Sequence, residues 1–237
     1  LPVVAAVVTV LLVTIVMYRL HKSGRSVRIL WVCAAIICCL VALLIPDVRF
    51  PVKRVHVSQY ITLAILVRFV LSHRMQGRSL TWFTFLVTFM FGIHDEMLQG
   101  MHPLRTFGLR DIAVNGFAGL SGTLFGLAAD FFPLKNSGAD NRLKLPEKSF
   151  LPVILLFIFA IIPAIAALLY PLIFYRKELI PWWTVEPLLA VLLAAALLEP
   201  RRQRLGTSFH GVQVLYWQAL LLVVYPVLVN VAFIEFN

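Results

Sequence analysis

The segment RILWVCAAIICCLVALLI, residues 28–45, carries its only charge, Arg28, at its first position. A helix needs about 20 apolar residues to cross the hydrocarbon core of a bilayer, so this run is long enough for one span. Runs of this kind recur along the chain. They predict an all-α, polytopic integral membrane helical bundle with about eight transmembrane helices, at 1–18, 28–45, 56–72, 80–98, 111–130, 150–174, 182–199 and 212–234.

The composition agrees with a membrane protein. Hydrophobic residues make up 61% of the chain and charged residues 14%, whereas a soluble domain carries about 25% charged residues. The net charge of +10 does not indicate nucleic acid, because basic residues of membrane proteins collect in cytoplasmic loops. Cys33, Cys38 and Cys39 all lie inside one apolar run, so we expect them to pack as small hydrophobes.

The distribution of basic residues predicts the topology. The first, third, fifth and seventh loops hold 13 Lys and Arg residues, and the other three loops hold 7. The positive-inside rule places the richer loops in the cytoplasm and both termini outside. Arg68 lies near the inner end of its span, where it can extend to the interface. Pro226 predicts a kink in the last span.

The loops also suggest how the chain is divided. Residues 131–149 are polar and rich in turn formers, which predicts a cytoplasmic loop. We expect an additional N-terminal helix and basic loop over 1–27, a four-helix core over 28–130, and an additional three-helix segment over 150–237. Segment 1–18 is too long and too uniformly apolar for a cleaved signal peptide, so we interpret it as a span.

The stretch FGIHDEMLQGMHPLRTFGLRDIAVNGFAG, residues 91–119, is unusually polar for such a chain. Charge inside a membrane costs a few kcal/mol per group, so its presence needs a reason. In the predicted topology the polar positions of spans three, four and five all reach the outer face. We therefore expect one convergent cluster, made of His56, Tyr60, Glu96, Gln99, Arg105, Asp111 and Asn115.

Each residue of this cluster allows a structural and a functional interpretation. Glu96 lies at a helix C-terminus, where the dipole disfavours a lone carboxylate, so it needs a cation, a proton or water. Arg105, Arg110 or Arg54 can supply the positive charge. Asp111 lies at a helix start, where it can cap free amides. His56 can exchange a proton or bind phosphate, and Arg105 suits a bidentate anion contact. His56, Glu96 and Asp111 are the candidate catalytic groups.

Two other features favour structural roles. His94, Asp95 and Glu96 are consecutive, which puts them on different faces of a helix, so we expect no metal and no cofactor. Gly119 and Gly122 continue the stripe of Asp111 and Asn115, and small residues allow a second helix backbone to come close.

Three motifs carry a resemblance to a known family. KRVHVSQYITL (53–63) resembles K-x-x-H-F-x-x-Y-x-x-L, GIHDEMLQ (92–99) resembles G-x-x-x-E-x-x-Q, and RTFGLRDIAVNGFAGLSG (105–122) resembles R-x(5)-D-x-x-x-N-x-x-G-x-x-x-G. These are patterns of the VanZ-like family, named for a teicoplanin-resistance accessory protein. Val57 replaces the usual Phe and Ala118 a Gly, and the resemblance covers about residues 28–130.

The resemblance implies a multi-pass protein of the bacterial cytoplasmic membrane and cell envelope. It adds Lys53 to the cluster, so that the implied polar set is Lys53, His56, Tyr60, Glu96, Gln99, Arg105, Asp111 and Asn115. It implies no reaction, so whether the chain is an enzyme stays open. One hypothesis is that the cluster binds or processes an anionic lipid or envelope head group. The alternative is a non-catalytic structural or accessory subunit of a larger membrane complex, with other integral membrane subunits as partners. A transporter is a third hypothesis, weakened by charges that lie near one interface.

Overall fold

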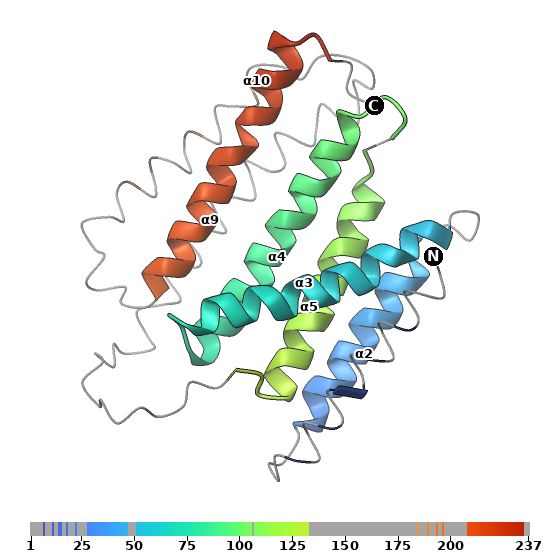
Figure 1. Cartoon of the computed structure of the whole chain (residues 1–237), viewed down its shortest axis with the longest axis vertical. Coiled ribbons are helices and arrows are strands. Elements are labelled where there is room, and N and C mark those ends of the chain that lie inside the picture. The colour runs from blue at the N-terminus through green and yellow to red at the C-terminus, as the bar shows by residue number, and fades with distance from the viewer. Residues whose placement is uncertain are drawn as a thin grey trace. The chain divides into compact units, whose positions relative to one another are not determined.

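The computed structural model describes residues 28–46, 51–105, 107–132 and 208–234, with isolated positions elsewhere. These ranges form α2 (Ile29–Leu44), the short 3-10 helix η1 (Pro51–Arg54), α3 (Val55–Ser72), α4 (Gly77–Gly100), α5 (Leu109–Ala128), α9 (Ser208–Leu222) and α10 (Val224–Val231), shown in Figure 1. No strand occurs within them, so the predicted all-α class is confirmed there. The predicted spans 1–18, 150–174 and 182–199 and the loop 131–149 lie almost wholly outside the described residues.

Two helical segments are long and apolar enough to cross a membrane by length and composition, Val55–Ser72 and His210–Val231. The helix Ile29–Leu44 is also apolar but shorter. Among the described ranges these two helices give weak support to a membrane location, because a buried core helix of a soluble protein has the same composition. The count of eight spans stays a prediction.

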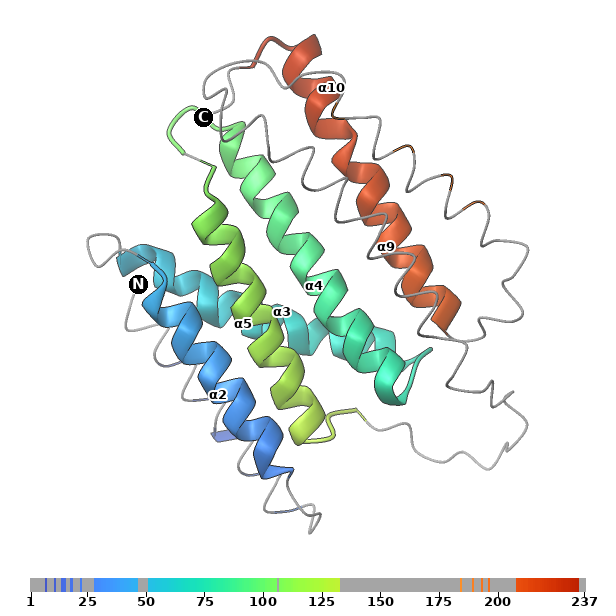
Figure 2. The same cartoon turned by 180° about the vertical axis from the view of Figure 1, so that it is seen from behind.

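The chain divides into two compact units, one formed by Leu1–Gly92 with Gly108–Lys135 and the other by Ile93–Phe107 with Asn136–Asn237. In the first unit α5 is the central helix, since both α2 and α3 pack against it. Figure 2 shows α2 running beside α5 while α3 crosses it. The apolar core between these helices is formed by Ala42, Val57, Tyr60, Ile61, Val114 and Ala118.

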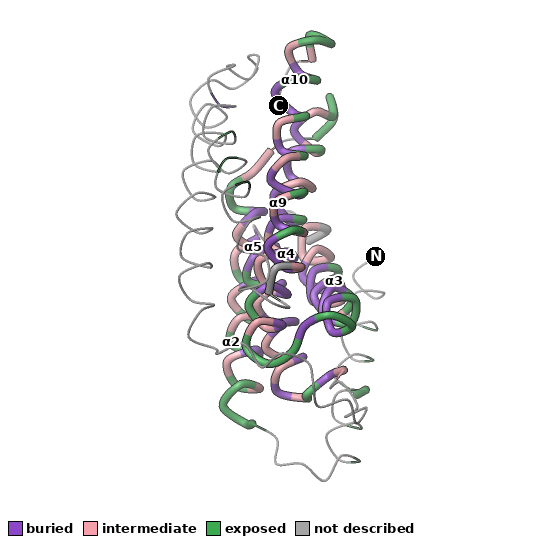
Figure 3. The backbone as a smooth tube through the Cα atoms, turned by 90° about the vertical axis from the view of Figure 1, so that its left-hand side faces the viewer, coloured by how far each residue is buried: buried purple, intermediate pink, exposed green. Residues whose placement is uncertain are grey.

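Small residues set how closely these helices approach. A Cβ atom added to Gly122 would lie 2.6 Å from the Ile61 carbonyl oxygen and 2.8 Å from the Ala64 Cβ. A contact with backbone cannot be relieved by a rotamer change, so α3 crosses α5 at a point where only glycine fits. The packing role predicted for Gly122 is confirmed. The buried residues of α5, purple in Figure 3, follow most of its length.

Arg68 behaves differently from the sequence expectation. Its side chain does not extend to an interface: the residue is 4% exposed, and Nε donates a hydrogen bond to the carbonyl oxygen of Phe131 at 3.1 Å. Phe131 follows the end of α5 at Ala128, where carbonyl groups have no partner in the helix. A cation there is also favoured by the helix dipole. Arg68 therefore fastens the end of α5 to α3.

In the second unit, α9 ends at Leu222 and α10 begins at Val224. The interruption has a local cause. Pro226 has no N–H to donate, and its ring clashes with the carbonyl of the residue four positions earlier, which is Leu222. The break predicted from Pro226 is thus confirmed.

Candidate functional site

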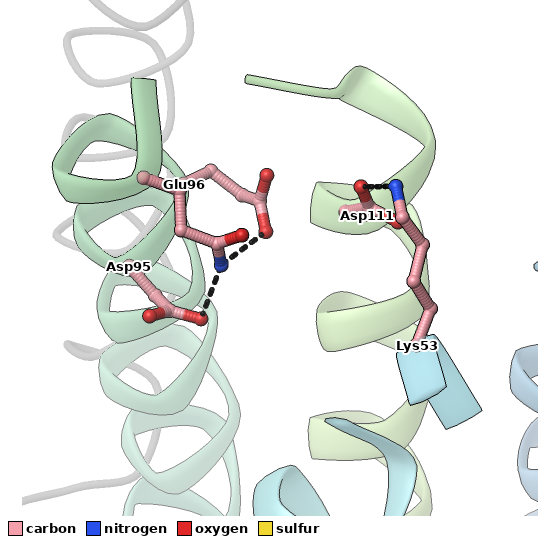
Figure 4. Close-up of polar contacts among 5 residues, drawn as sticks. Lys53, Asp95, Glu96 and Asp111 are labelled. Atoms are coloured by element: carbon pink, nitrogen blue, oxygen red, sulfur yellow. Dashed lines mark hydrogen bonds and ion pairs between the residues drawn. The ribbon is translucent and has the colours of Figure 1, made fainter. Parts of the chain in front are cut away.

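An ion pair joins the start of α3 to the start of α5. Lys53 Nζ donates to Asp111 Oδ2 at 2.5 Å, as Figure 4 shows. The Lys53 side chain is 40% exposed and that of Asp111 only 9%. The buried carboxylate therefore gains a cation that still reaches water, which lowers the cost of keeping it charged.

Local structure explains the position of Asp111. Helix α5 begins at Leu109 with Gly108 in the cap position, so Asp111 lies in the first turn. A Cβ atom at Gly108 would come within 2.9 Å of Asp111 Oδ2, which means that the glycine leaves room for the carboxylate. A negative charge in the first turn is also favoured by the helix dipole.

Asn115 follows Asp111 by one helical turn and is fully buried, with 0% of its surface exposed. Within the described ranges, neither its amide nitrogen nor its amide oxygen has a hydrogen-bond partner. Leaving a buried polar group unsatisfied costs about 1–3 kcal/mol, and Asn115 has two such atoms. A leucine of similar volume would avoid this cost, so packing alone does not account for an asparagine at this position.

Asn115 meets Tyr60 at Gly92 of α4. A Cβ atom at Gly92 would lie 2.9 Å from the Asn115 Cβ and 3.5 Å from Tyr60 Cε1. The Tyr60 hydroxyl donates to the carbonyl oxygen of Phe91 at 3.3 Å. The His56 ring lies nearly parallel to that of Tyr60, with centroids 6.4 Å apart. The helix starts of α3 and α5 thus bring an imidazole, a phenol and an amide to one region of the first unit.

The acidic end of α4 belongs to the second unit. Gln99 Nε2 donates to Glu96 Oε1 at 3.1 Å and to Asp95 Oδ2 at 3.2 Å, the two dashed lines at one side of Figure 4. Glu96 is fully buried. The neutral amide of Gln99 is thus one hydrogen-bond partner of the Glu96 carboxylate, and the cation considered for Glu96 stays a prediction. Arg105 lies in the exposed turn after α4.

The structure therefore brings five of the eight predicted residues together: Lys53, His56, Tyr60, Asp111 and Asn115. Glu96, Gln99 and Arg105 belong to the other unit, and their joining with the first five stays a prediction.

The sequence suggested Arg54 only as a possible partner of Glu96. Arg54 lies beside Lys53 in η1, and its buried Nε has no hydrogen-bond partner in the described part of the chain. Sequence reasoning missed a bond between His94 Nδ1 and the Tyr225 hydroxyl at 3.0 Å. These residues are 131 positions apart, so no local pattern could have shown their contact.

The groups assembled in the first unit suit recognition better than covalent chemistry. They offer a partly exposed ammonium, a buried carboxylate, an amide and two aromatic rings. Comparison with known proteins gives no match to a family model, to a curated protein or to a solved structure. The function is therefore argued from these residues.

Proposed function

We propose that this chain is a VanZ-like, multi-pass protein of the bacterial cytoplasmic membrane whose polar cluster binds an anionic lipid or envelope head group. The observation that carries the proposal is the fully buried Asn115, whose two amide atoms lack partners among the described residues, one turn from a charged pair. If the site needed no ligand, the protein itself would be expected to supply hydrogen-bond partners for this amide.

Apolar surface supports a membrane location. Ile29, Leu30, Ile37 and Leu44 of α2 are all more than half exposed, although α2 packs against α5 on its other side. Surface of this kind is costly in water and is expected where a helix faces lipid. Leu66 and Val70 of α3 are exposed in the same way.

The motifs support one site. Lys53, His56 and Tyr60 come from the first motif of the VanZ-like pattern, and Asp111 and Asn115 come from the third. The Lys53–Asp111 pair and the Gly92 contact join these motifs, although Lys53 and Asp111 are 58 residues apart. Gly92 opens the second motif, whose Glu96 lies one turn further along α4. In this proposal Lys53 and Arg54 supply positive charge to the head group.

The Lys53–Asp111 bond also favours a second candidate, a structural or accessory subunit of a membrane complex. In that case the pair would serve to fasten α3 to α5, and no ligand would be needed. The two candidates predict different effects of removing the Lys53 charge. A head-group site would lose bound lipid, whereas a structural pair would lose stability, so both quantities are measured on the same variants.

The test uses the full chain, extracted in mild detergent and examined by native mass spectrometry for retained lipid, with its unfolding temperature measured in parallel. We expect the wild-type protein to retain an anionic lipid. Lys53→Met and Arg54→Met should lower its occupancy, because each removes a cation from the site. Arg78→Met is the matched control, since Arg78 is an exposed arginine at the opposite end of α4.

The structural candidate makes the opposite forecast. Lys53→Met would then lower stability by about 1 kcal/mol, as for a half-exposed ion pair, and Lys53→Met with Asp111→Asn would restore it. Lipid occupancy would not change in any variant. Equal occupancy in the wild type, Lys53→Met and Arg54→Met would rule out the head-group site.

A further inference from the structure

The chemistry of Asn115 limits what its partner can be. The amide nitrogen needs an acceptor and the amide oxygen needs a donor. A phosphodiester offers acceptors alone, and an ammonium group offers donors alone. A hydroxyl offers both, so one hydroxyl, or two on neighbouring carbons, can satisfy both atoms of Asn115.

The buried hydroxyl groups of α4 and α5 differ from Asn115 in this respect. Thr84 and Thr88 of α4 donate to carbonyl groups of their own helix, at 2.6 and 2.7 Å. Thr123 of α5 donates to the Gly119 oxygen at 2.8 Å, and Ser121 donates to the Ala35 oxygen on α2 at 2.8 Å. The fold thus supplies partners for these buried hydroxyl groups and none for Asn115 within the described ranges.

Exposure falls steadily across the site. Lys53 is partly open to solvent, Asp111 is nearly buried, and Asn115 is completely buried. Arg54 lies next to Lys53 in η1 and has a buried Nε free of hydrogen bonds to described residues. Positive charge from Lys53 and Arg54 therefore lies at the more exposed end of the site. The neutral amide of Asn115 lies one helical turn beyond Asp111 on α5.

We infer that the ligand is a phosphodiester bearing a hydroxylated head group, with its phosphate near Lys53 and Arg54 and a hydroxyl at Asn115. This inference rests on the proposed function and adds which head groups the site selects. A lipid such as phosphatidylglycerol has this order of groups, because its hydroxyls lie beyond the phosphate as seen from the acyl chains. A free glycerol phosphodiester shares the same chemistry without the acyl chains.

The test compares ligands of equal charge. Binding of short-chain phosphatidylglycerol to the full chain in detergent is measured by calorimetry and compared with phosphatidylmethanol, an anionic phosphodiester lipid without a hydroxyl. Glycerophosphoglycerol, the free head group, is the third ligand. Asn115→Leu removes the amide at similar volume. Thr123→Val is the control, a buried polar change on the same helix whose hydroxyl is satisfied within that helix.

We expect phosphatidylglycerol to bind about tenfold more tightly than phosphatidylmethanol, the factor that corresponds to one good hydrogen bond to a buried group. Asn115→Leu should reduce this ratio to about one while its unfolding temperature stays equal or rises, and Thr123→Val should keep the ratio. The comparison of lipids on the wild-type chain needs no variant, so it holds even if Asn115→Leu does not fold.

Equal binding of the two lipids would overturn the inference, since a buried water would then suffice for Asn115, but it would leave the head-group site standing. Failure of both lipids and of the free head group to bind would overturn the proposed function itself. Tight binding of glycerophosphoglycerol, at the affinity of the lipid, would support the hydroxyl selectivity and identify the source as a soluble phosphodiester.

Discussion

Gly122 of α5 lies against the backbone of Ile61 on α3, so closely that an added Cβ would be 2.6 Å from the Ile61 oxygen and 2.9 Å from its Cα. This crossing holds α5 against α3, the two helices whose first turns carry Asp111 and His56. The geometry of the candidate site therefore depends on a glycine about two helical turns beyond Asn115 and about three beyond Asp111.

Gly122→Ala should destabilise the protein by about 1–3 kcal/mol, because the methyl group forces two helix backbones apart. Thermal unfolding in detergent measures the effect. Gly116→Ala is the matched control: its new Cβ would meet only the Phe89 ring, at 3.0 and 3.1 Å, and a side chain can move. Helix propensity also favours alanine over glycine, so we expect little net loss there. Equal losses in the two variants would contradict the close crossing.

Much of the first unit could be predicted from the sequence, and the reason is local. Apolar runs ended by polar loops predicted α2, α3, α4 and α5 to within a few residues, since hydrophobic length and turn formers act over short distances. The glycine stripe predicted the close packing of α5. His56, Tyr60, Asp111 and Asn115 followed from the ends of those runs, and Lys53 followed from the resemblance of its motif.

What could not be predicted depends on distant contacts. Nothing near Arg68 in the sequence shows that its guanidinium meets the Phe131 carbonyl, 63 residues later. Likewise, the sequence showed that Asn115 shares a face with Asp111, but whether its amide is satisfied depends on which side chains surround it in the folded chain.

Arg68→Met should lower stability by roughly 1.5–3 kcal/mol, the usual contribution of a hydrogen bond to a charged group. The variant keeps the aliphatic stem packed against Gly126 but leaves the Phe131 carbonyl without its donor. Arg74→Met, at an exposed position just after α3, is the control and should change stability by less than about 0.5 kcal/mol. If the two variants unfold together, Arg68 does not fasten the end of α5.

His94 and Tyr225 should be energetically coupled. His94 Nε2 lies 3.0 Å from the Gln218 carbonyl oxygen, which can only accept, so this nitrogen carries the proton. In the neutral ring Nδ1 is then the acceptor for the Tyr225 hydroxyl, at 3.0 Å.

A double-mutant cycle with Tyr225→Phe and His94→Phe checks this bond. We expect Tyr225→Phe to cost about 1 kcal/mol and the coupling energy to be about 0.5–1.5 kcal/mol. Tyr216→Phe, on the neighbouring helix α9, serves as the control. Additive losses in the cycle would show that the bond does not contribute to stability.

The predicted topology can be checked at two exposed loop positions. Gln76 precedes α4 in a loop that the distribution of basic residues places in the cytoplasm, and Pro103 follows α4 in a loop placed outside. Gln76→Cys and Pro103→Cys would each be introduced after replacing Cys33, Cys38 and Cys39 by alanine. In intact spheroplasts, a membrane-impermeant maleimide should label the cysteine at position 103 and should label that at position 76 only after lysis.

Labelling of both positions in intact spheroplasts would mean that α4 does not cross the membrane, and the polar cluster would then need another explanation than an outer-face site. The reverse pattern would keep α4 as a span but place Lys53, His56 and Asp111 at the cytoplasmic face, where the head group would have to come from the inner leaflet.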